Sequence, residues 1–324
     1  MRIRGWVELD GQVLSGSEIA EIISRRGGEI SRFGGEFFIE WDECRARDHY
    51  GIIPGNCPAG TCLCSGDEPV LIRPDLTELS LQEAIIKAVS LRAADGITAL
   101  SGGVDSALVA ALAGRPCLCV GVADSHDLRR AQKVAGELDL SLECRVVTPS
   151  EIADALVIVS GLIQDPTPVD ISIATTLFFV AEKARELGYE RILTGQGADE
   201  VFGGYSRYME RSSEELIETF AADFAGLPRQ GLRDQTVAGY HDTWLSMPYL
   251  DIRVVCAAAS IPPHEKVRDG IRKRPLREVA ACYLPEETAY YDKKAMQYGT
   301  GIWKEIKRLA RKNGYQNSVS DYLH

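Results

Sequence analysis

Two short glycine-rich segments carry residue types that could bind a nucleotide. The first, Ser101–Ser106 (S-G-G-V-D-S), follows an apolar run at residues 97–100 and precedes an alanine-rich one. Consecutive glycines let the backbone turn sharply and approach a ligand without a Cβ in the way. The N–H groups of such a turn, and of the first turn of the following helix, bind anions. The string predicts a phosphate-binding loop, although Ser-Gly-Gly alone is also found in an ordinary strand-to-helix turn.

This loop differs from the two most familiar nucleotide-binding motifs. It has neither the Gly-Lys-Ser/Thr of a Walker loop nor the G-x-G-x-x-G of a Rossmann fingerprint. The second segment, Gly195–Glu200 (G-Q-G-A-D-E), also follows an apolar run, at residues 191–194. In open parallel sheets, ligands bind outside the carboxyl ends of the strands, near the switch in strand order. We therefore expect both segments at that edge of one sheet.

The elements that must position these segments alternate between strand and helix. This alternation predicts an α/β fold with a parallel sheet and a mainly helical part from about residue 203 onward. The expected strands are residues 97–100, 117–122, 141–147 and 191–194. The expected helices are residues 80–94 and 104–113, two that end at residues 138 and 162, and residues 172–187.

Residues 1–76 are expected to form a separate, small, β-rich domain. Alternation and turn residues predict a hairpin, one helix and further short strands. The hairpin spans residues 3–13, the helix runs from residue 15 to residue 27, and the strands are residues 33–41, 45–53, 61–63 and 70–72. Prolines and polar residues before residue 80 mark a linker, so the second domain is expected to be residues 77–324.

Composition limits the class of protein. The chain has 324 residues, 45% of them hydrophobic, and a formal net charge of −11. Non-specific nucleic-acid binding needs a basic surface, which this charge disfavours, although a nucleic acid as substrate stays open. The N-terminal residues lack the apolar core of a signal peptide, and no apolar run reaches the length of a membrane span. We expect a cytoplasmic protein.

The nine cysteines are scattered, which argues against a disulfide framework. Cys57, Cys62 and Cys64 form a cluster, with Cys44 upstream. Their spacing matches no common zinc motif, and no second ligand pair follows. Small residues on a short hairpin are therefore favoured over a metal or persulfide site.

The two glycine-rich motifs, in this order, give the chain a resemblance to the asparagine synthetase family. Further stretches share it: residues 120–128, Pro248–Asp251 (P-Y-L-D), residues 273–285 and residues 293–299. The resemblance extends over about residues 80–310 and implies an ATP-pyrophosphatase synthetase domain. In the family, this domain is usually joined to an N-terminal glutaminase domain.

The resemblance implies a role for each motif. The loop would hold the pyrophosphate of ATP, and Asp105 and Asp199 would hold Mg2+ between the phosphates, as hard carboxylate ligands do. The alternative for each acid is an ordinary cap or first-turn charge of a helix. Leu100, Val120 and Gly195 match positions that line the adenosine pocket, or are plain core residues of the sheet. The implied nucleotide-binding residues are Leu100, Ser101, Gly102, Gly103, Asp105, Ser106, Val120 and Gly195.

Two of the candidate catalytic residues match the family pattern, and the third departs from it. Lys293 and Lys294 match the family's late lysine by context, with Lys293 slightly favoured, or they form solvated surface. Gln196 stands where the family usually has Glu, and a neutral amide cannot act as a base. Upstream of Pro248, the usual Glu-x-Arg is replaced by residues 244–246 (W-L-S). His241 and Asp242 could substitute, or form an exposed pair in a helix without a function.

The N-terminal block resembles the last hairpin of the glutaminase domain, at residues 33–41 and 46–54. Such a glutaminase needs a cysteine directly after the initiator Met. Position 2 is Arg2, so we expect no hydrolysis of glutamine. The truncated domain is expected to serve as a cover or docking surface. Residues 1–75 could then contact a second copy of the chain or a separate ammonia-supplying subunit, because the missing half leaves a sheet edge.

The leading hypothesis is an ATP-dependent ligase. It would adenylate a small-molecule carboxylate, aspartate or a similar one, and transfer the acyl group to ammonia or another nitrogen nucleophile, with AMP and pyrophosphate as products. One alternative is a tailoring enzyme that amidates, thiolates or cyclises a different substrate. The other is a nucleotide-binding partner subunit with impaired catalysis. Retention of both Asp105 and Asp199 argues against the last, because an inactive site needs neither acid.

Overall fold

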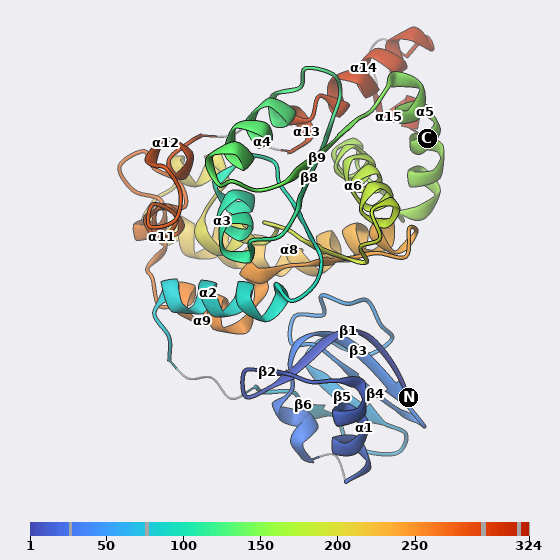
Figure 1. Cartoon of the computed structure of the whole chain (residues 1–324), viewed down its shortest axis with the longest axis vertical. Helices are drawn as coiled ribbons and strands as arrows, with labels where there is room; N and C mark the ends of the chain where they lie inside the picture. Colours follow the sequence, from blue (N-terminus) through green and yellow to red (C-terminus); the bar gives the residue numbers. More distant parts are fainter. Residues whose placement is uncertain (26–27, 75–77, 293–295, 316–318, 324) are drawn as a thin grey trace. The chain divides into compact units, whose positions relative to one another are not determined.

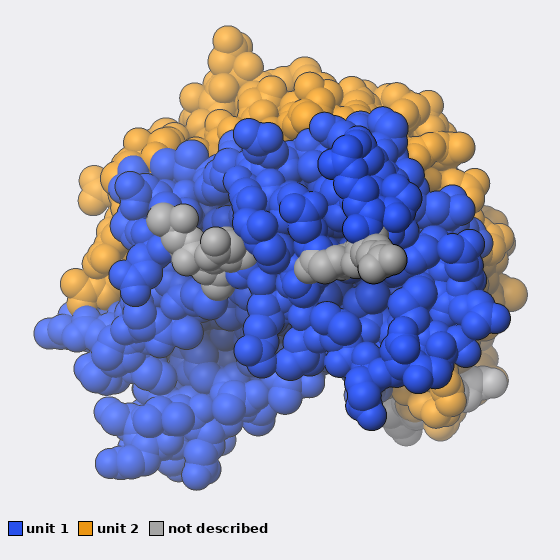
Figure 2. All heavy atoms as spheres, turned by 90° about the horizontal axis from the view of Figure 1, so that it is seen from below, with its two compact units in different colours: residues 1–91, 197–235, 246–272 blue, residues 92–196, 236–245, 273–324 orange. Residues whose placement is uncertain are grey.

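The computed structural model describes residues 1–25, 28–74, 78–292, 296–315 and 319–323. The chain is α/β and contains a six-stranded and a five-stranded sheet. It divides into two compact units (Figure 2). Unit 1 comprises residues 1–91, 197–235 and 246–272, and unit 2 comprises residues 92–196, 236–245 and 273–324.

The six-stranded sheet lies in unit 1, and its strands have the order β2-β1-β3-β4-β5-β6 (Figure 1). Neighbouring strands are antiparallel wherever their register is given, as in the hairpin of the first two, where Glu8 faces Val13. The strands are β1 Arg2–Leu9, β2 Gln12–Val13, β3 Gly34–Trp41, β4 Cys44–Arg47, β5 Thr61–Cys64 and β6 Val70–Leu71. The expected hairpin at residues 3–13 is therefore confirmed.

Apolar side chains from one face of this sheet and from helix α1, Gly16–Ser24, form a core. Ser15 and Glu18 cap the helix reciprocally, as the sequence S-G-S-E predicts. The strand expected at residues 45–53 is shorter than predicted. The chain turns after Arg47 because the Asp48 carboxylate accepts the N–H groups of Ile52 and Ile53 at 2.8 and 3.0 Å.

Helices make up most of the rest of unit 1. They include α7, which starts inside the glycine-rich segment Gly195–Glu200, and α9, which starts directly after the P-Y-L-D segment. The elements are η1 Gly28–Arg32, α2 Leu81–Arg92, α7 Ala198–Phe202, η2 Ser206–Glu210, α8 Ser213–Gly239, η3 Pro248–Leu250, α9 Ile252–Ala259 and α10 Pro263–Lys266. The last four residues of α8 belong to unit 2.

The five-stranded sheet has the order β11-β10-β7-β8-β9 (Figure 1). The chain runs outward from β7 through β8 to β9 and then returns to the other side of β7 with β10, and these pairs are parallel. Strand order thus reverses between β7 and β10. The strands are β7 Ile97–Ala99, β8 Cys117–Gly121, β9 Leu142–Val146, β10 Arg191–Leu193 and β11 Trp244–Ser246.

Helices cover both faces of this sheet. In Figure 1, α3 and α4 lie on one side of β8 and β9, and α5 and α6 lie on the other. The helices are α3 Val104–Ala113, α4 His126–Glu137, α5 Pro149–Leu162, α6 Pro168–Glu186, α11 Arg274–Ala280, α12 Glu286–Ala289, α13 Met296–Gly299, α14 Ile302–Lys312 and α15 Val319–Leu323. The expected parallel α/β architecture is confirmed. Within the described residues, no helix is both long and apolar enough to span a bilayer.

One prediction on this part was wrong in detail, and the mainly helical part includes one strand. Helix α6 begins at Pro168 rather than at residue 172, because Thr167 and Asp170 form a capping box and Pro168 occupies the first turn. The part after residue 203 also contains strand β11, which lies beside β10 at the sheet edge. The Trp244 N–H donates to the Glu190 carbonyl at 2.8 Å. The domain boundary at residues 76/77 stays a prediction, since the compact units follow a different division.

The cysteine cluster forms a disulfide rather than four free thiols. Cys44 and Cys64 are directly opposite on β4 and β5 and are bonded to each other. Cys57 and Cys62 are free and buried. The expectation that the cysteines make no disulfide framework therefore missed one pair, because only the strand register brings residues 44 and 64 together.

Candidate active site

The loop Ser101–Ser106 leaves the carboxyl end of β7 and turns into α3. Two serine side chains hold its shape. The Ser106 hydroxyl accepts the Ser101 N–H at 3.1 Å and lies 2.9 Å from the Ser101 hydroxyl. It also donates to the Gly103 carbonyl at 3.3 Å. The two serines thus act on the loop itself, and the predicted turn from strand to helix is present.

Gly102 of the loop must be a glycine because Arg130 lies directly against it. Gly102 has a φ of +75°, and a Cβ there would lie 2.6 Å from the Cβ of Arg130 and 2.7 Å from its carbonyl carbon. Gly103 is the N-cap of α3 and contributes no side-chain hydrogen bond. Because the N-cap Gly103 has no side chain, it does not cap the first N–H groups of α3. Such N–H groups suit an anion.

Asp105 stands in the first turn of α3 and forms an ion pair with Lys273, whose Nζ donates to Oδ2 at 2.7 Å. The Lys273 side chain is 8% exposed and that of Asp105 is 25% exposed. Lys273 adopts a left-handed φ of +55° at the N-cap of α11. The structure thus places a cation on the carboxylate that the sequence assigns to a metal.

The second glycine-rich segment meets the first through Gly195. A Cβ at Gly195 would lie 2.8 Å from the Cβ of Asp105 and 2.9 Å from the Ser106 nitrogen. Only a glycine lets the chain after β10 lie against the start of α3. Thr194 donates its hydroxyl to the Gln196 side-chain oxygen at 3.2 Å. The sequence prediction that both segments lie near the strand-order switch agrees with this contact.

Asp199 lies in unit 1, in the first turn of the short helix α7. Its neighbour Glu200 is buried and accepts hydrogen bonds from the Tyr205 hydroxyl at 2.5 Å and from the Gln230 amide at 3.3 Å. Burial raises the pKa of Glu200 above its ordinary value. Gly197, at a φ of +84°, precedes α7 and packs on Leu250.

Four other predicted site residues remain, two of them in the described part of the chain. Leu100 and Val120 are buried in the sheet, 1% and 3% exposed, as core residues are. Lys293 and Lys294 lie outside the described residues. Their roles, and those of Gln196 and the loop residues, stay predictions.

Sequence reasoning missed a cluster on α4 beside the loop. The Arg130 guanidinium stacks on the Tyr291 ring, 3.7 Å from its centroid. The Tyr291 hydroxyl is 2.7 Å from His126 Nε2, and His126 Nδ1 is 3.2 Å from Asp127 Oδ1. The string Ser125–Leu128 signalled the family resemblance but did not show that residue 291 would be its partner. Lys273 lies in residues 273–285, which share the family resemblance, but the sequence suggested no role for it.

The substituted residues upstream of Pro248 have structural partners. Ser246 is fully buried and donates to Glu36 Oε2 at 2.5 Å. The Met247 N–H donates to Glu36 Oε1 at 2.8 Å. Trp244 stacks under Arg191, with 5.0 Å between the guanidinium carbon and the ring centroid.

His241 is not part of an exposed helical pair. It lies in the turn after α8 and is half-buried, with its ring 4.3 Å from that of Phe178. Burial lowers the pKa of His241 below its ordinary value. An imidazole packed in this way is mainly neutral at pH 7, which disfavours it as a substitute for the missing arginine.

A magnesium ion fits the donors of this site only together with a phosphate ligand. Within the described residues, no group of three or more His, Cys, Asp or Glu side chains could hold a metal. Mg2+ commonly binds through one or two carboxylates plus phosphate oxygens and water. Asp105 supplies one such carboxylate beside the loop, and the Lys273 contact shows that its position suits a positive partner.

The family model for asparagine synthase matches residues 80–245 and 227–323. The chain belongs to the asparagine synthase family. It is 32% identical over 287 residues to a protein of Methanocaldococcus jannaschii named as an asparagine synthetase (glutamine-hydrolysing), covering 75% of this chain and 53% of that protein. It is 27% identical over 302 residues to one of the same name in Dictyostelium discoideum, covering 83% and 53%.

The chain thus spans about half the length of these curated relatives. Among solved structures, an NMN synthetase from Francisella tularensis matches with a TM-score of 0.30 and 13% identity, covering 72% of this chain and 96% of that one. Membership of the asparagine synthase family supports an ATP-dependent ligase.

Proposed function

We propose that this protein is an asparagine-synthetase-like ligase that activates a carboxylate with ATP and transfers it to ammonia. The carboxylate oxygen attacks the α-phosphorus, the bond to the bridging oxygen breaks, and pyrophosphate leaves. Ammonia then attacks the acyl carbon, loses a proton and displaces AMP. The observation that carries the proposal is the contact of Gly195 with Asp105 and Ser106, where the order of strands reverses.

The chain's own groups suit the phosphate part of this reaction. The N–H groups at the start of α3 face charge that builds up on the leaving pyrophosphate. Lys273, at the N-cap of α11, adds a buried positive charge beside the first turn of α3, since its ammonium contacts Asp105. A bound Mg2+, held in part by Asp105 and in the family pattern by Asp199, would neutralise the phosphates.

We propose ammonia rather than glutamine as the nitrogen source. Cutting glutamine needs a reactive thiol or an equivalent nucleophile. The first cysteine of the chain is Cys44, which is in a disulfide, and the next two, Cys57 and Cys62, are buried.

We keep the cytoplasm as the proposed location, where ammonium and ATP are both present. The redox state of the Cys44–Cys64 pair in cells tests that location, because cytosolic thiols are kept reduced.

Pyrophosphate exchange tests the activation step. The purified chain, Mg2+, ATP and labelled pyrophosphate would be incubated with single carboxylates, aspartate first. Label entering ATP only when aspartate is present would support the proposal. The proposal would be contradicted if the chain bound ATP but no carboxylate, including those in a cell extract, supported exchange. That result would favour a nucleotide-binding partner subunit.

The buried Ser246 favours a second candidate, a tailoring enzyme with a different carboxylate. The family's arginine at this position is absent, and the serine hydroxyl donates to Glu36 instead. Gln196 replaces an acid, so two groups that could recognise or deprotonate an amino-acid substrate are changed. Exchange with another acid but not with aspartate would support this candidate.

A further inference from the structure

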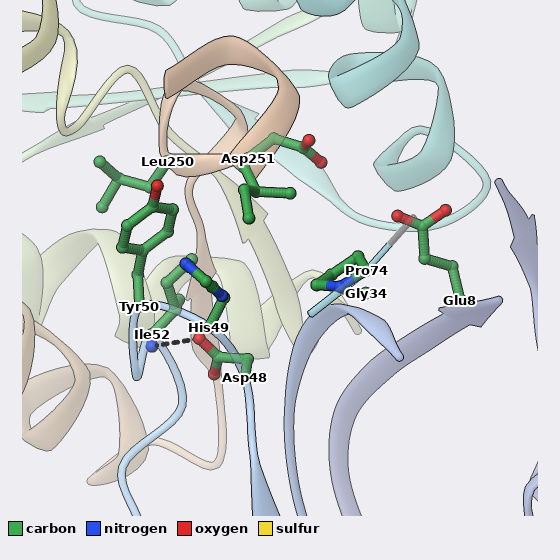
Figure 3. Close-up of a pocket in the computed structure, with 11 residues that line it drawn as sticks. Glu8, Gly34, Asp48, His49, Tyr50, Ile52, Pro74, Leu250 and Asp251 are labelled. Atoms are coloured by element: carbon green, nitrogen blue, oxygen red, sulfur yellow. Dashed lines mark hydrogen bonds between the residues drawn. The ribbon is translucent and has the colours of Figure 1, made fainter. Parts of the chain in front are cut away.

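A hollow in unit 1 lies beside a buried carboxylate that has an unused oxygen. It has an open volume of about 300 Å³ and leaves room for about one water-sized molecule. Glu8 at the end of β1, the backbone of Gly34 and Gly35, and Asp251 before α9 contribute to its wall (Figure 3). All of these residues belong to the same compact unit.

Glu8 is the key group because it is 1% exposed. Its Oε1 accepts a hydrogen bond from Arg253 Nη2 at 2.5 Å. Its Oε2 is buried and has no hydrogen-bond partner among the described residues. A buried polar atom without a partner is costly, and for a charged group the cost is larger. The unused oxygen therefore calls for a donor in the hollow.

The surroundings favour a cationic donor. Arg253 also binds Asp251, with Nη1 at 3.1 Å from Oδ1, so two carboxylates share this guanidinium. Both acids line the hollow (Figure 3). Hydrogen bonds between a charged donor and a carboxylate are roughly twice as strong as those between neutral groups.

The donor set disfavours a divalent metal. No group of three or more His, Cys, Asp or Glu side chains that could hold a metal occurs in the described part of the chain. An ammonium ion needs no such shell, because its N–H groups donate directional hydrogen bonds to a few acceptors. It is also about the size of the water molecule for which the hollow has room.

We propose that this hollow binds an ammonium ion through Glu8 Oε2 and holds the nitrogen substrate of the ligase. The use of the bound ion rests on the proposed function, whereas its binding does not. Gly34 leaves room for this carboxylate beside β3, since a Cβ there would lie 2.5 Å from Glu8 Oε1. The site thus depends on residues of β1 and β3 whose chemistry the sequence did not reveal.

Binding is tested on the full chain without turnover. The melting temperature would be followed while ammonium chloride replaces sodium or potassium chloride at constant ionic strength. We expect a saturable rise with ammonium alone. Equal melting temperatures in all three salts would overturn the proposal and leave water in the hollow. A potassium effect as large as that of ammonium would also overturn it, because potassium has no N–H donor.

The matched variants are Glu8→Gln and Glu43→Gln. Glutamine keeps an oxygen for Arg253 but places its own NH2 where the unused oxygen lies, so the ammonium-dependent rise should vanish. Glu43→Gln removes the same charge from an exposed turn of the same sheet and should retain the rise. If the rise persisted in Glu8→Gln, the assigned site would be wrong.

Two readouts keep the proposal separate from variant folding and from the proposed function. Line broadening of 15N-labelled ammonium by the unmodified chain, relieved by excess unlabelled ammonium but not by potassium, needs no variant; unbroadened lines would overturn the site. In turnover assays, Glu8→Gln should raise KM for ammonium about tenfold, as expected for the loss of a charge-assisted hydrogen bond. Ammonium binding without pyrophosphate exchange would refute the ligase alone, and exchange without ammonium binding would refute the site alone.

Discussion

At the scale of single residues, the site depends on one ion pair. Asp105 is held 2.7 Å from Lys273, and Lys273 is nearly buried. Removing one partner of such a pair leaves the other charge poorly compensated. The pair therefore keeps a carboxylate beside the loop.

Asp105→Asn should lower pyrophosphate exchange by about 100-fold or more, the usual loss when one charge-stabilising group of an active site is removed. Asparagine keeps an oxygen for Lys273 but not the charge that would bind Mg2+. The matched control is Asp154→Asn, an exposed acid on α5 in the same unit, which should retain the rate. Normal exchange in Asp105→Asn would contradict the metal assignment.

Asp48 makes the stability of the chain depend on pH. Burial raises the pKa of its carboxyl from 3.8 to about 6, although N–H groups of Ile52 and Ile53 oppose the shift. Between pH 3.8 and about 6, the folded state therefore holds a proton that the unfolded state has released. The contribution of Asp48 to the free energy of unfolding is complete below pH ~4 and is lost as the pH rises through about 6. Its size is on the order of 3 kcal/mol.

Urea unfolding from pH 4 to pH 8 measures this contribution. Asp48→Asn cannot titrate, so the difference in unfolding free energy between the original chain and the variant should narrow as the pH rises through about 6. A constant difference across this range would show that Asp48 has the same pKa in both states. Asp42→Asn, at an exposed acid of the same sheet, is the control substitution.

At the scale of elements, the alternation of strands and helices predicted the sheet around the loop, and the structure follows it. Periodicity reports which residues are buried, so buried runs such as that of β8 are recognised easily. It does not report partners distant in the chain. Strand β11, the Cys44–Cys64 bond and the approach of Lys273 to Asp105 all depend on register or on long-range packing.

The contact between the two glycine-rich segments can be tested by adding one methyl group. Gly195→Ala would place a Cβ 2.8 Å from Asp105 and 2.9 Å from the backbone of Ser106. Because the backbone must shift, we expect a loss of about 1–3 kcal/mol in unfolding free energy and a lower exchange rate. Chemical denaturation and exchange assays measure both.

Gly136→Ala is the control for this substitution. Gly136 lies in α4, and a Cβ there would meet nothing within 4 Å. Alanine should stabilise this helix by up to ~1 kcal/mol without changing the exchange rate. If Gly195→Ala behaved like Gly136→Ala, the close approach of the segments would not matter for the reaction.

At the scale of the whole molecule, the N-terminal sheet is more than an appended block. Within unit 1, the buried Glu36 carboxylate accepts hydrogen bonds from Trp6 Nε1 at 2.9 Å and from Ser246 and Met247. Arg253 joins Glu8 and Asp251 in the same unit. Because these contacts join residues far apart in the chain, sequence patterns do not reveal them. They give Ser246, one of the departures at residues 244–246, a structural partner that no motif could show.

The N-terminal sheet offers no reactive thiol, because Cys44 and Cys64 are bonded to each other and Cys62 is buried. Burial raises the pKa of the Cys62 thiol to about 11, so at neutral pH it is protonated and a poor nucleophile. With ATP, Mg2+ and the carboxylate that supports exchange, 15N-ammonium should label the product in step with AMP release. Glutamine labelled at its amide nitrogen should not, and no glutamate should form. Label arriving from glutamine with the purified chain alone would mean that another of its residues cuts the amide.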